Sequence, residues 1–190
     1  SVKKILDANR DVIVIVDEAY IDFGGESALN LIDEYDNLLV VRTFSKSRSM
    51  AGLRIGYAIG NEELIKALND VKYSYNSYTM NMAAIELGAA VLEDKEYFDT
   101  TVAKIVDTRE AAKIRLKELG FTFPDSKTNF VFAKPSKITA KQMFEELKKR
   151  NIYVRYFTGE RVKEHLRITI GTDEEMERFF EAVEEIQGEI

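Results

Sequence analysis

Residues 11–60 of the 190-residue chain read DVIVIVDEAYIDFGGESALNLIDEYDNLLVVRTFSKSRSMAGLRIGYAIG, and this stretch decides the fold. Asp11–Asp17 is a short, nearly all-apolar and β-branched run, which is typical of a parallel strand covered on both faces. Ser27–Tyr35 has helical spacing and begins with a serine positioned to cap it. Leu38–Phe44 is a second apolar run. Strand, short helix and strand together predict a right-handed βαβ unit.

The pattern outside that unit predicts two different halves. Leu53–Gly60 has the pattern of a third strand, and Asn61–Val71 that of a helix. Helical spacing resumes at Met80 and continues to a stop at Gly120, with a break near Glu93–Asp94.

After Gly120 the pattern becomes that of a small α+β unit. Its expected elements are short strands at Phe130–Ala133, Tyr153–Tyr156 and Leu166–Ile170, and amphipathic helices at Ala140–Arg150 and Asp173–Gln187. We therefore predict an α/β segment over residues 1–95 and a small α+β domain over residues 96–190.

Composition excludes several classes of function. The chain has 27 Lys and Arg against 33 Asp and Glu, a net charge of −6, which argues against a nucleic-acid partner or a polybasic membrane surface. It has no cysteine and a single histidine, His165, so cysteine-based zinc sites, thiol nucleophiles and multi-histidine metal sites are excluded. No apolar run approaches the roughly 18 residues of a membrane span, and no signal-peptide pattern opens the chain. A cytoplasmic protein without a metal site is the expectation.

Polar residues cluster where the predicted strands end, which is where open α/β sheets bind ligands. The clusters are Asp17–Tyr20, Thr43–Lys46 and Ser49–Tyr57. Taken alone, Asp17 is equally consistent with a residue that simply ends the strand, and a lysine placed as Lys46 is usually a solvated surface residue. Arg54 lies within an apolar, strand-like run, where a guanidinium requires an anionic partner.

One alternative for Asp17 is magnesium binding in a P-loop ATPase. An apolar strand that ends in Asp-Glu is the Walker B pattern. The Gly-rich Walker A loop is absent from these 190 residues, and it would have to precede Asp17 in a longer chain.

Together, the clusters provide what pyridoxal phosphate (PLP) requires. A lysine amine forms a Schiff base with the cofactor's aldehyde. A carboxylate keeps the pyridine nitrogen protonated, a phenol hydrogen-bonds the ring O3′, and hydroxyl and guanidinium groups hold the phosphate.

Three segments carry a family resemblance, namely VIVIVDEAYIDF (Val12–Phe23), NLLVVRTFSKSRSMAGLRIGYAIG (Asn37–Gly60) and HLRITIGT (His165–Thr172). They resemble the aspartate-aminotransferase-like family of class I and II PLP enzymes, and within it the histidinol-phosphate aminotransferases. The resemblance extends over essentially the whole chain. It implies a segment of the three-layer, fold type I large domain followed by the small C-terminal domain.

The resemblance also implies residue roles. Lys46 matches the catalytic Schiff-base lysine, Asp17 the partner of the pyridinium nitrogen, and Tyr20 the tyrosine at O3′. Ser45 and Arg54 match the phosphate ligands, with Thr43 nearby.

Substrate roles fall on two arginines of the second half. Arg167 matches the arginine that binds the α-carboxylate of glutamate or 2-oxoglutarate, a role that suits the paired donors of a guanidinium. Arg155 is a weaker match for a contact with the substrate phosphate, and an exposed strand arginine explains it equally well. The implied reaction converts histidinol phosphate and 2-oxoglutarate into imidazole-acetol phosphate and glutamate, in histidine biosynthesis, by a homodimer without nucleic-acid or membrane partners.

The chain also departs from the family. Arg48 stands where an aromatic residue is common, and we expect it to add positive charge near the phosphate ligands. The N-terminal part that precedes the Asp17 strand in the family is missing here, so the chain alone is expected to bind PLP weakly and to be inactive. Three alternatives stay open: a threonine-phosphate decarboxylase, another fold type I PLP enzyme, and a folded fragment without catalysis.

Overall fold

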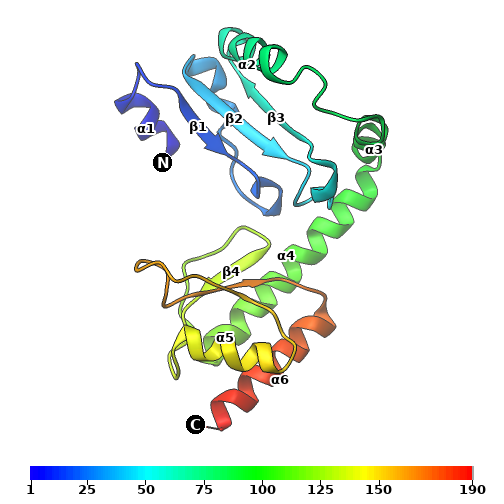
Figure 1. Cartoon of the computed structure of the whole chain (residues 1–190). Coiled ribbons are helices and arrows are strands. Elements are labelled where there is room, and N and C mark those ends of the chain that lie inside the picture. The colour runs from blue at the N-terminus through cyan, green and yellow to red at the C-terminus, as the bar shows by residue number, and fades with distance from the viewer. Residues whose placement is uncertain (190) are drawn as a thin grey trace. The chain divides into compact units, whose positions relative to one another are not determined.

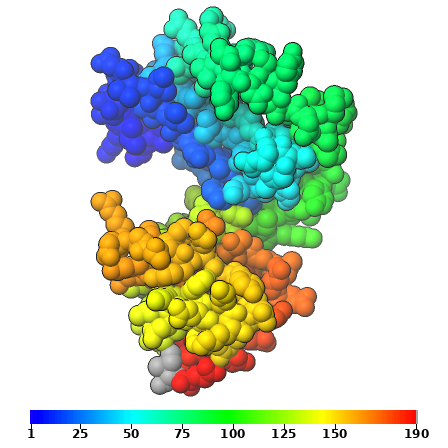
Figure 2. Space-filling model, viewed as in Figure 1, coloured from blue at the N-terminus to red at the C-terminus, as the bar shows by residue number. Residues whose placement is uncertain are grey.

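The computed structural model describes residues 1–189, and the chain forms two compact units, Ser1–Thr100 and Thr101–Ile190. Each unit has its own sheet and can be followed by colour in the ribbon and space-filling views (Figures 1 and 2). Within residues 1–189, no helix combines the length and apolar character needed to cross a membrane.

The sheet of the first unit has the order β1 (Val14–Asp17), β2 (Leu38–Thr43), β3 (Gly56–Gly60) (Figure 1). β1 and β2 are parallel, and β3 is antiparallel to β2. The predicted βαβ unit is therefore confirmed, although its helix, η2 (Ala28–Glu34), is a 3-10 helix. The Ser27 hydroxyl caps it by accepting a hydrogen bond from the Leu29 amide at 3.1 Å.

One face of this sheet is packed. α1 (Val2–Ala8) and η2 cover it, and Leu6, Tyr35 and Val40 are buried between them. Side chains of a strand alternate between faces, so Val14 and Val16 join this core while Ile15 points the other way and is 62% exposed. The prediction that β1 is covered on both faces is wrong for the described residues 1–189.

The third predicted strand begins later than expected. Residues 51–53 form a 3-10 turn, η3 (Ala51–Leu53), and Arg54 follows it in the left-handed conformation, with φ of 56°. Because that conformation is incompatible with a strand, pairing with β2 starts only at Gly56.

Three helices follow β3. α2 (Glu62–Tyr75) is capped by the Asn61 side chain, and α3 (Met82–Glu93) by that of Asn81. The predicted break lies at Asp94, after which α4 (Lys95–Glu118) begins. Gly120 lies just past α4 with φ of 82°, as its predicted stop requires.

The second unit surrounds an antiparallel sheet of order β4 (Phe130–Ala133), β6 (Leu166–Thr169), β5 (Arg155–Tyr156). α5 (Ala140–Lys149) and α6 (Asp173–Gly188) pack with the C-terminal part of α4 on this sheet (Figure 1). They enclose one continuous core, whose fully buried members include Leu116, Val131, Met143, Leu147, Leu166 and Val183. Only Arg155 and Tyr156 of the predicted strand Tyr153–Tyr156 pair, and Tyr153 is exposed.

Candidate functional site

The ends of β1 and β2 bring Lys46 and Tyr20 together. The strands are parallel and in register, with Asp17 opposite Val41, so the residues that follow each strand emerge at the same edge. The Lys46 ammonium lies 5.3 Å from the centroid of the Tyr20 ring. Lys46 is exposed, and among residues 1–189 it forms no ion pair with a carboxylate.

Asp17 is the last residue of β1 and is also exposed. Its Oδ1 accepts a hydrogen bond from the Ala19 amide at 2.9 Å, which turns the chain toward Tyr20. Within the described residues the carboxylate has no cationic partner, so Oδ2 is available to a donor from a ligand.

Two hydroxyl groups gather where β2 ends. Thr43 Oγ1 lies 2.9 Å from Ser45 Oγ and 3.2 Å from the carbonyl oxygen of Ile55, and it accepts a hydrogen bond from the Ser45 amide at 3.1 Å. These contacts link the start of the Lys46 loop to the segment beside Arg54. The two hydroxyls form a small polar group of the kind that binds phosphate oxygens.

Arg54 differs from its prediction. It does not lie in a strand, and its side chain is exposed rather than surrounded by apolar residues. Its Nη1 donates to the carbonyl of Ala51 at 3.0 Å, and no ion pair to it occurs among residues 1–189. Its remaining donors are therefore free for an anion.

The arginine with an anionic partner is Arg42, which the sequence prediction did not include. It lies on β2 and pairs with the buried carboxylate of Glu18: Nε donates to Oε2 at 3.0 Å, and Nη2 lies 2.9 Å from the same oxygen. Burial alone lowers the pKa of Arg42, but the hydrogen bonds to Glu18 and Tyr57 outweigh it and raise that pKa above its ordinary value. The signal was present in LLVVRTF, an apolar strand that contains this one charge.

Two further contacts flank Lys46. The hydroxyl of Ser47, which is buried, donates to Asp22 Oδ2 at 2.5 Å. Arg48 donates to the carbonyl of Val91 in α3 at 3.2 Å, and its guanidinium lies 4.1 Å from the centroid of the Phe98 ring. Arg48 therefore packs against α3 and the start of α4, and the expectation that it adds charge near the phosphate ligands is not supported.

Arg167 and Arg155 lie opposite each other in the second unit, on the paired strands β6 and β5. The guanidinium of Arg167 lies 5.4 Å from the centroid of the Phe130 ring, and that of Arg155 lies 5.4 Å from the centroid of the Phe157 ring. Arg167 Nε is buried and has no hydrogen-bond partner in the described structure, and neither arginine forms an ion pair there. Two neighbouring cations without anions form a suitable site for a carboxylate or phosphate.

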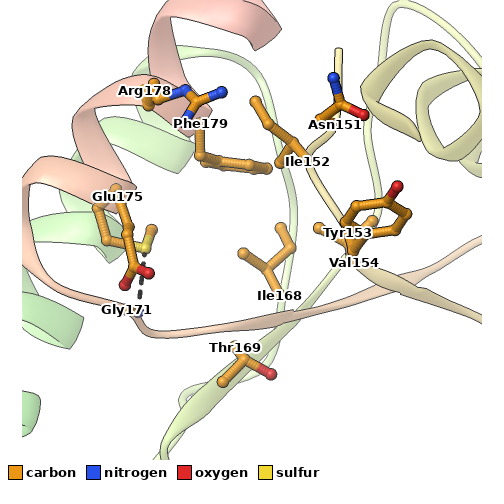
Figure 3. A pocket seen from close by; sticks show the side chains of 11 residues that line it. Asn151, Ile152, Tyr153, Val154, Ile168, Thr169, Gly171, Glu175, Arg178 and Phe179 are labelled. Carbon is orange, nitrogen blue, oxygen red and sulfur yellow. Dashed lines mark hydrogen bonds between the residues drawn. The ribbon is translucent and has the colours of Figure 1, made fainter. Parts of the chain in front are cut away.

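A separate pocket of about 320 Å³ lies between β6, α6 and the segment before β5 (Figure 3). Its lining includes Tyr153, Ile168 and Phe179, and none of the predicted site residues. Glu175 on its wall already accepts a hydrogen bond from the Thr172 amide at 2.8 Å, as part of the cap of α6. The pocket is therefore not the site that the sequence predicts.

Comparisons with known proteins identify the family. Residues 1–183 match the model of the aminotransferase class I and II family. The chain is 52% identical over 185 residues to the histidinol-phosphate aminotransferase of Brachyspira hyodysenteriae, an alignment that covers 97% of this chain and 52% of that protein. The chain thus spans about half the length of the curated relatives it matches.

Two solved structures extend the comparison. The histidinol-phosphate aminotransferase of Sinorhizobium meliloti, in complex with pyridoxal-5′-phosphate, superposes with a TM-score of 0.81 at 26% identity, over 93% of this chain and 49% of that chain. The L-threonine-O-3-phosphate decarboxylase of Porphyromonas gingivalis superposes with a TM-score of 0.77 at 22% identity, over 98% of this chain and 58% of that chain. The second likeness shows a shared fold alone.

Proposed function

The chain belongs to the aminotransferase class I and II family, and from this premise we propose that it carries the lysine-bearing part of a PLP-dependent histidinol-phosphate aminotransferase. The observation that carries the proposal is the approach of Lys46 to Tyr20 at the shared edge of β1 and β2. The 52% identity to the Brachyspira hyodysenteriae protein supports the substrate assignment. Membership in this family also replaces the P-loop ATPase alternative for Asp17.

The residues at this edge fit PLP. A Schiff-base lysine needs an amine that is not committed to an ion pair, and Lys46 meets this condition among residues 1–189. Asp17 keeps one carboxylate oxygen for the pyridinium N–H. The Tyr20 phenol supplies a donor for O3′, and the hydroxyls of Thr43 and Ser45, with Arg54, supply donors for the phosphate.

PLP, when bound, withdraws electrons from the substrate Cα and so makes its proton acidic. Lys46 Nζ would hold the cofactor before substrate arrives and would then move a proton from and to the substrate Cα. Asp17 would keep the pyridine nitrogen protonated through its charge.

In the second unit, Arg167 would bind the α-carboxylate of glutamate or 2-oxoglutarate, and Arg155 would bind the phosphate of histidinol phosphate. We assign residues 1–95 to the cofactor-binding large domain and residues 96–190 to the small domain. The proposed setting is a homodimer in the cytoplasm.

Trapping the lysine with borohydride tests cofactor binding directly. The chain is incubated with PLP, reduced, digested and analysed by mass spectrometry. We expect the phosphopyridoxyl group on Lys46, and its loss from the Lys46→Ala variant. Lys72→Ala is the matched control, because exposed Lys72 lies 5.4 Å from the centroid of the Tyr73 ring, much as Lys46 lies from Tyr20. Because the chain alone is expected to bind PLP weakly, the labelling is repeated in a chimera completed by the remaining residues of the Brachyspira hyodysenteriae aminotransferase. Equal labelling of Lys46 and Lys72 in both proteins would contradict the proposal.

A chimera tests the substrate. The chain replaces the matching part of the Brachyspira hyodysenteriae aminotransferase, whose remaining residues supply what the chain does not span. We expect transfer of an amino group between histidinol phosphate and 2-oxoglutarate. Release of CO2 from threonine phosphate without this transfer would instead favour the decarboxylase alternative.

A further inference from the structure

The buried carboxylate of Glu18 joins three segments of the first unit. Glu18 directly follows Asp17, and its carboxylate accepts hydrogen bonds from Arg42 on β2, from the Ser27 hydroxyl at 2.9 Å and from the Ala28 amide at 2.6 Å. Arg42 Nη2 also donates to Ser27 Oγ at 3.0 Å. The end of β1, the end of β2 and the start of η2 are therefore held at one point.

A second link lies beyond Tyr20 and Lys46. The Ser47 hydroxyl reaches Asp22, in the 3-10 turn η1 (Ile21–Phe23) that follows Tyr20. Phe44 and Ser47 are both buried, while Lys46 between them is exposed. The backbone on either side of Lys46 is thus anchored, and its amine is free.

We propose that Glu18 and Ser47 are positioning residues, which hold Lys46 beside Tyr20 by tying residues 18–23 to residues 42–47 on both sides of the pair. The proposal rests on the proposed function, since it concerns the geometry that Lys46 offers to PLP. Neither side chain needs to touch the cofactor, because Glu18 acts through Arg42 and Ser47 through Asp22.

Fold stability alone is a poor explanation for the Glu18 contacts. Replacement of a buried carboxylate–guanidinium pair by apolar residues is often neutral or stabilising, because both ions lose their hydration. Such a pair instead fixes an orientation. The planar guanidinium of Arg42 and the carboxylate of Glu18 restrict the position of the end of β1 relative to the end of β2. At position 47, an alanine would fill the same buried space, so what the serine adds is its hydrogen bond to Asp22.

The experiment compares labelling of Lys46 with that of Lys72 in the same borohydride-reduced sample, which cancels differences in PLP concentration. Glu18→Gln removes the charge, and Ser47→Ala removes the hydroxyl. We expect each variant to lower the Lys46 to Lys72 ratio by about tenfold, the low end for outer residues that orient a site. Ser47→Thr keeps the hydroxyl and is expected to restore the ratio.

Controls make the same chemical changes nearby. Glu26→Gln alters an exposed carboxylate in the same loop, and Ser74→Ala removes a hydroxyl that binds only its own helix. A second readout needs no cofactor: amide hydrogen exchange of residues 43–49 is expected to accelerate in Ser47→Ala at unchanged melting temperature. Glu18→Gln is expected to accelerate it too, and to lower the melting temperature as well, because it leaves the Arg42 guanidinium without its anion. Should Glu18→Gln fail to fold, Ser47→Ala still tests whether these contacts hold Lys46 beside Tyr20.

The two proposals fail in different ways. If Lys46 is labelled no more than Lys72 in both the unaltered chain and the Brachyspira hyodysenteriae chimera, the proposed function fails, and the exchange readout still decides whether Glu18 and Ser47 hold the loop. If Lys46 is selectively labelled and the ratio stays the same in Glu18→Gln and Ser47→Ala, the positioning role is overturned.

Discussion

Lys113 bridges two carboxylates on the surface of the second unit. Its ammonium lies 2.7 Å from Glu110 Oε2 and 2.5 Å from Asp125 Oδ1. The hydrogen bond from Lys113 is the largest cause that lowers the pKa of Glu110 below 4.5 and that of Asp125 below 3.8. Carboxylates with lowered pKa stabilise the folded state above their unfolded pKa, and this contribution is lost as the pH falls through the folded pKa.

Glu110→Gln is therefore expected to weaken the acid dependence of stability. The free energy of unfolding should fall at neutral pH, because Glu110 also accepts hydrogen bonds from Nε and Nη2 of the buried Arg109 at 3.0 Å and 2.9 Å, and the variant removes the charge that these donors face. The difference from the unaltered chain should shrink at pH values below those pKa values, as measured by urea unfolding. Glu118→Gln, on the same helix and without an ion pair among residues 1–189, is the control. A constant difference at all pH values would contradict this account.

Arginines show what residue-level prediction can and cannot reach. A guanidinium in an apolar strand needs an anion, and Arg42 meets this need through Glu18. The sequence pattern instead predicts that Arg54 is the strand arginine with an anionic partner, because the expected strand, Leu53–Gly60, includes it. Arg54 itself has the left-handed conformation, so the strand starts after it and its side chain is exposed. The local pattern LRIGY contains no signal for the positive φ of Arg54, since left-handed backbone is uncommon outside glycine.

Secondary elements with strong periodicity were predicted well. The helices that became α3 to α6 have caps and apolar spacing that local chemistry determines, and their predicted ends differ from the observed ones by only a few residues. The short strand Phe130–Ala133 was also predicted with the bounds of β4, whereas two other short elements were predicted poorly. β5 contains only Arg155 and Tyr156, and η3 replaces the start of a predicted strand, because pairing with a neighbour determines both.

The cap of α6 offers a test at the scale of one element. Thr172 Oγ1 accepts from the Glu175 amide at 3.2 Å, and Glu175 accepts a hydrogen bond from the Thr172 amide. We expect Thr172→Ala to lower the free energy of unfolding by about 1 kcal/mol. Thr172→Ser, which keeps the hydroxyl, should cost much less in the same urea titration. Equal losses in both variants would mean that the methyl group, and not the hydrogen bond, is responsible.

At the scale of the molecule, the two units differ in how much apolar surface they bury. All but two of the exposed large hydrophobic side chains of residues 1–189, Ile114 and Tyr153, lie in Ser1–Thr100. α2 has no buried residue at all. The first unit has two small buried clusters, whereas one large cluster fills the second. Sequence alone did not show this asymmetry, since apolar residues are abundant in both halves and only packing reveals which are buried.

Stability should follow the same division. Free energies of local opening scale with buried apolar contacts, so amides of β4, β6 and α6 are expected to exchange more slowly than those of β1, β2 and β3. Leu147→Ala removes a side chain that is fully buried in the second unit and should cost about 2–5 kcal/mol there. Because each unit has its own core, the variant should accelerate exchange in residues 101–189 and leave residues 1–100 unchanged. Leu87→Ala, at a position that is 49% exposed on α3, should change neither. Acceleration in both units by Leu147→Ala would show instead that they open as a single cooperative structure.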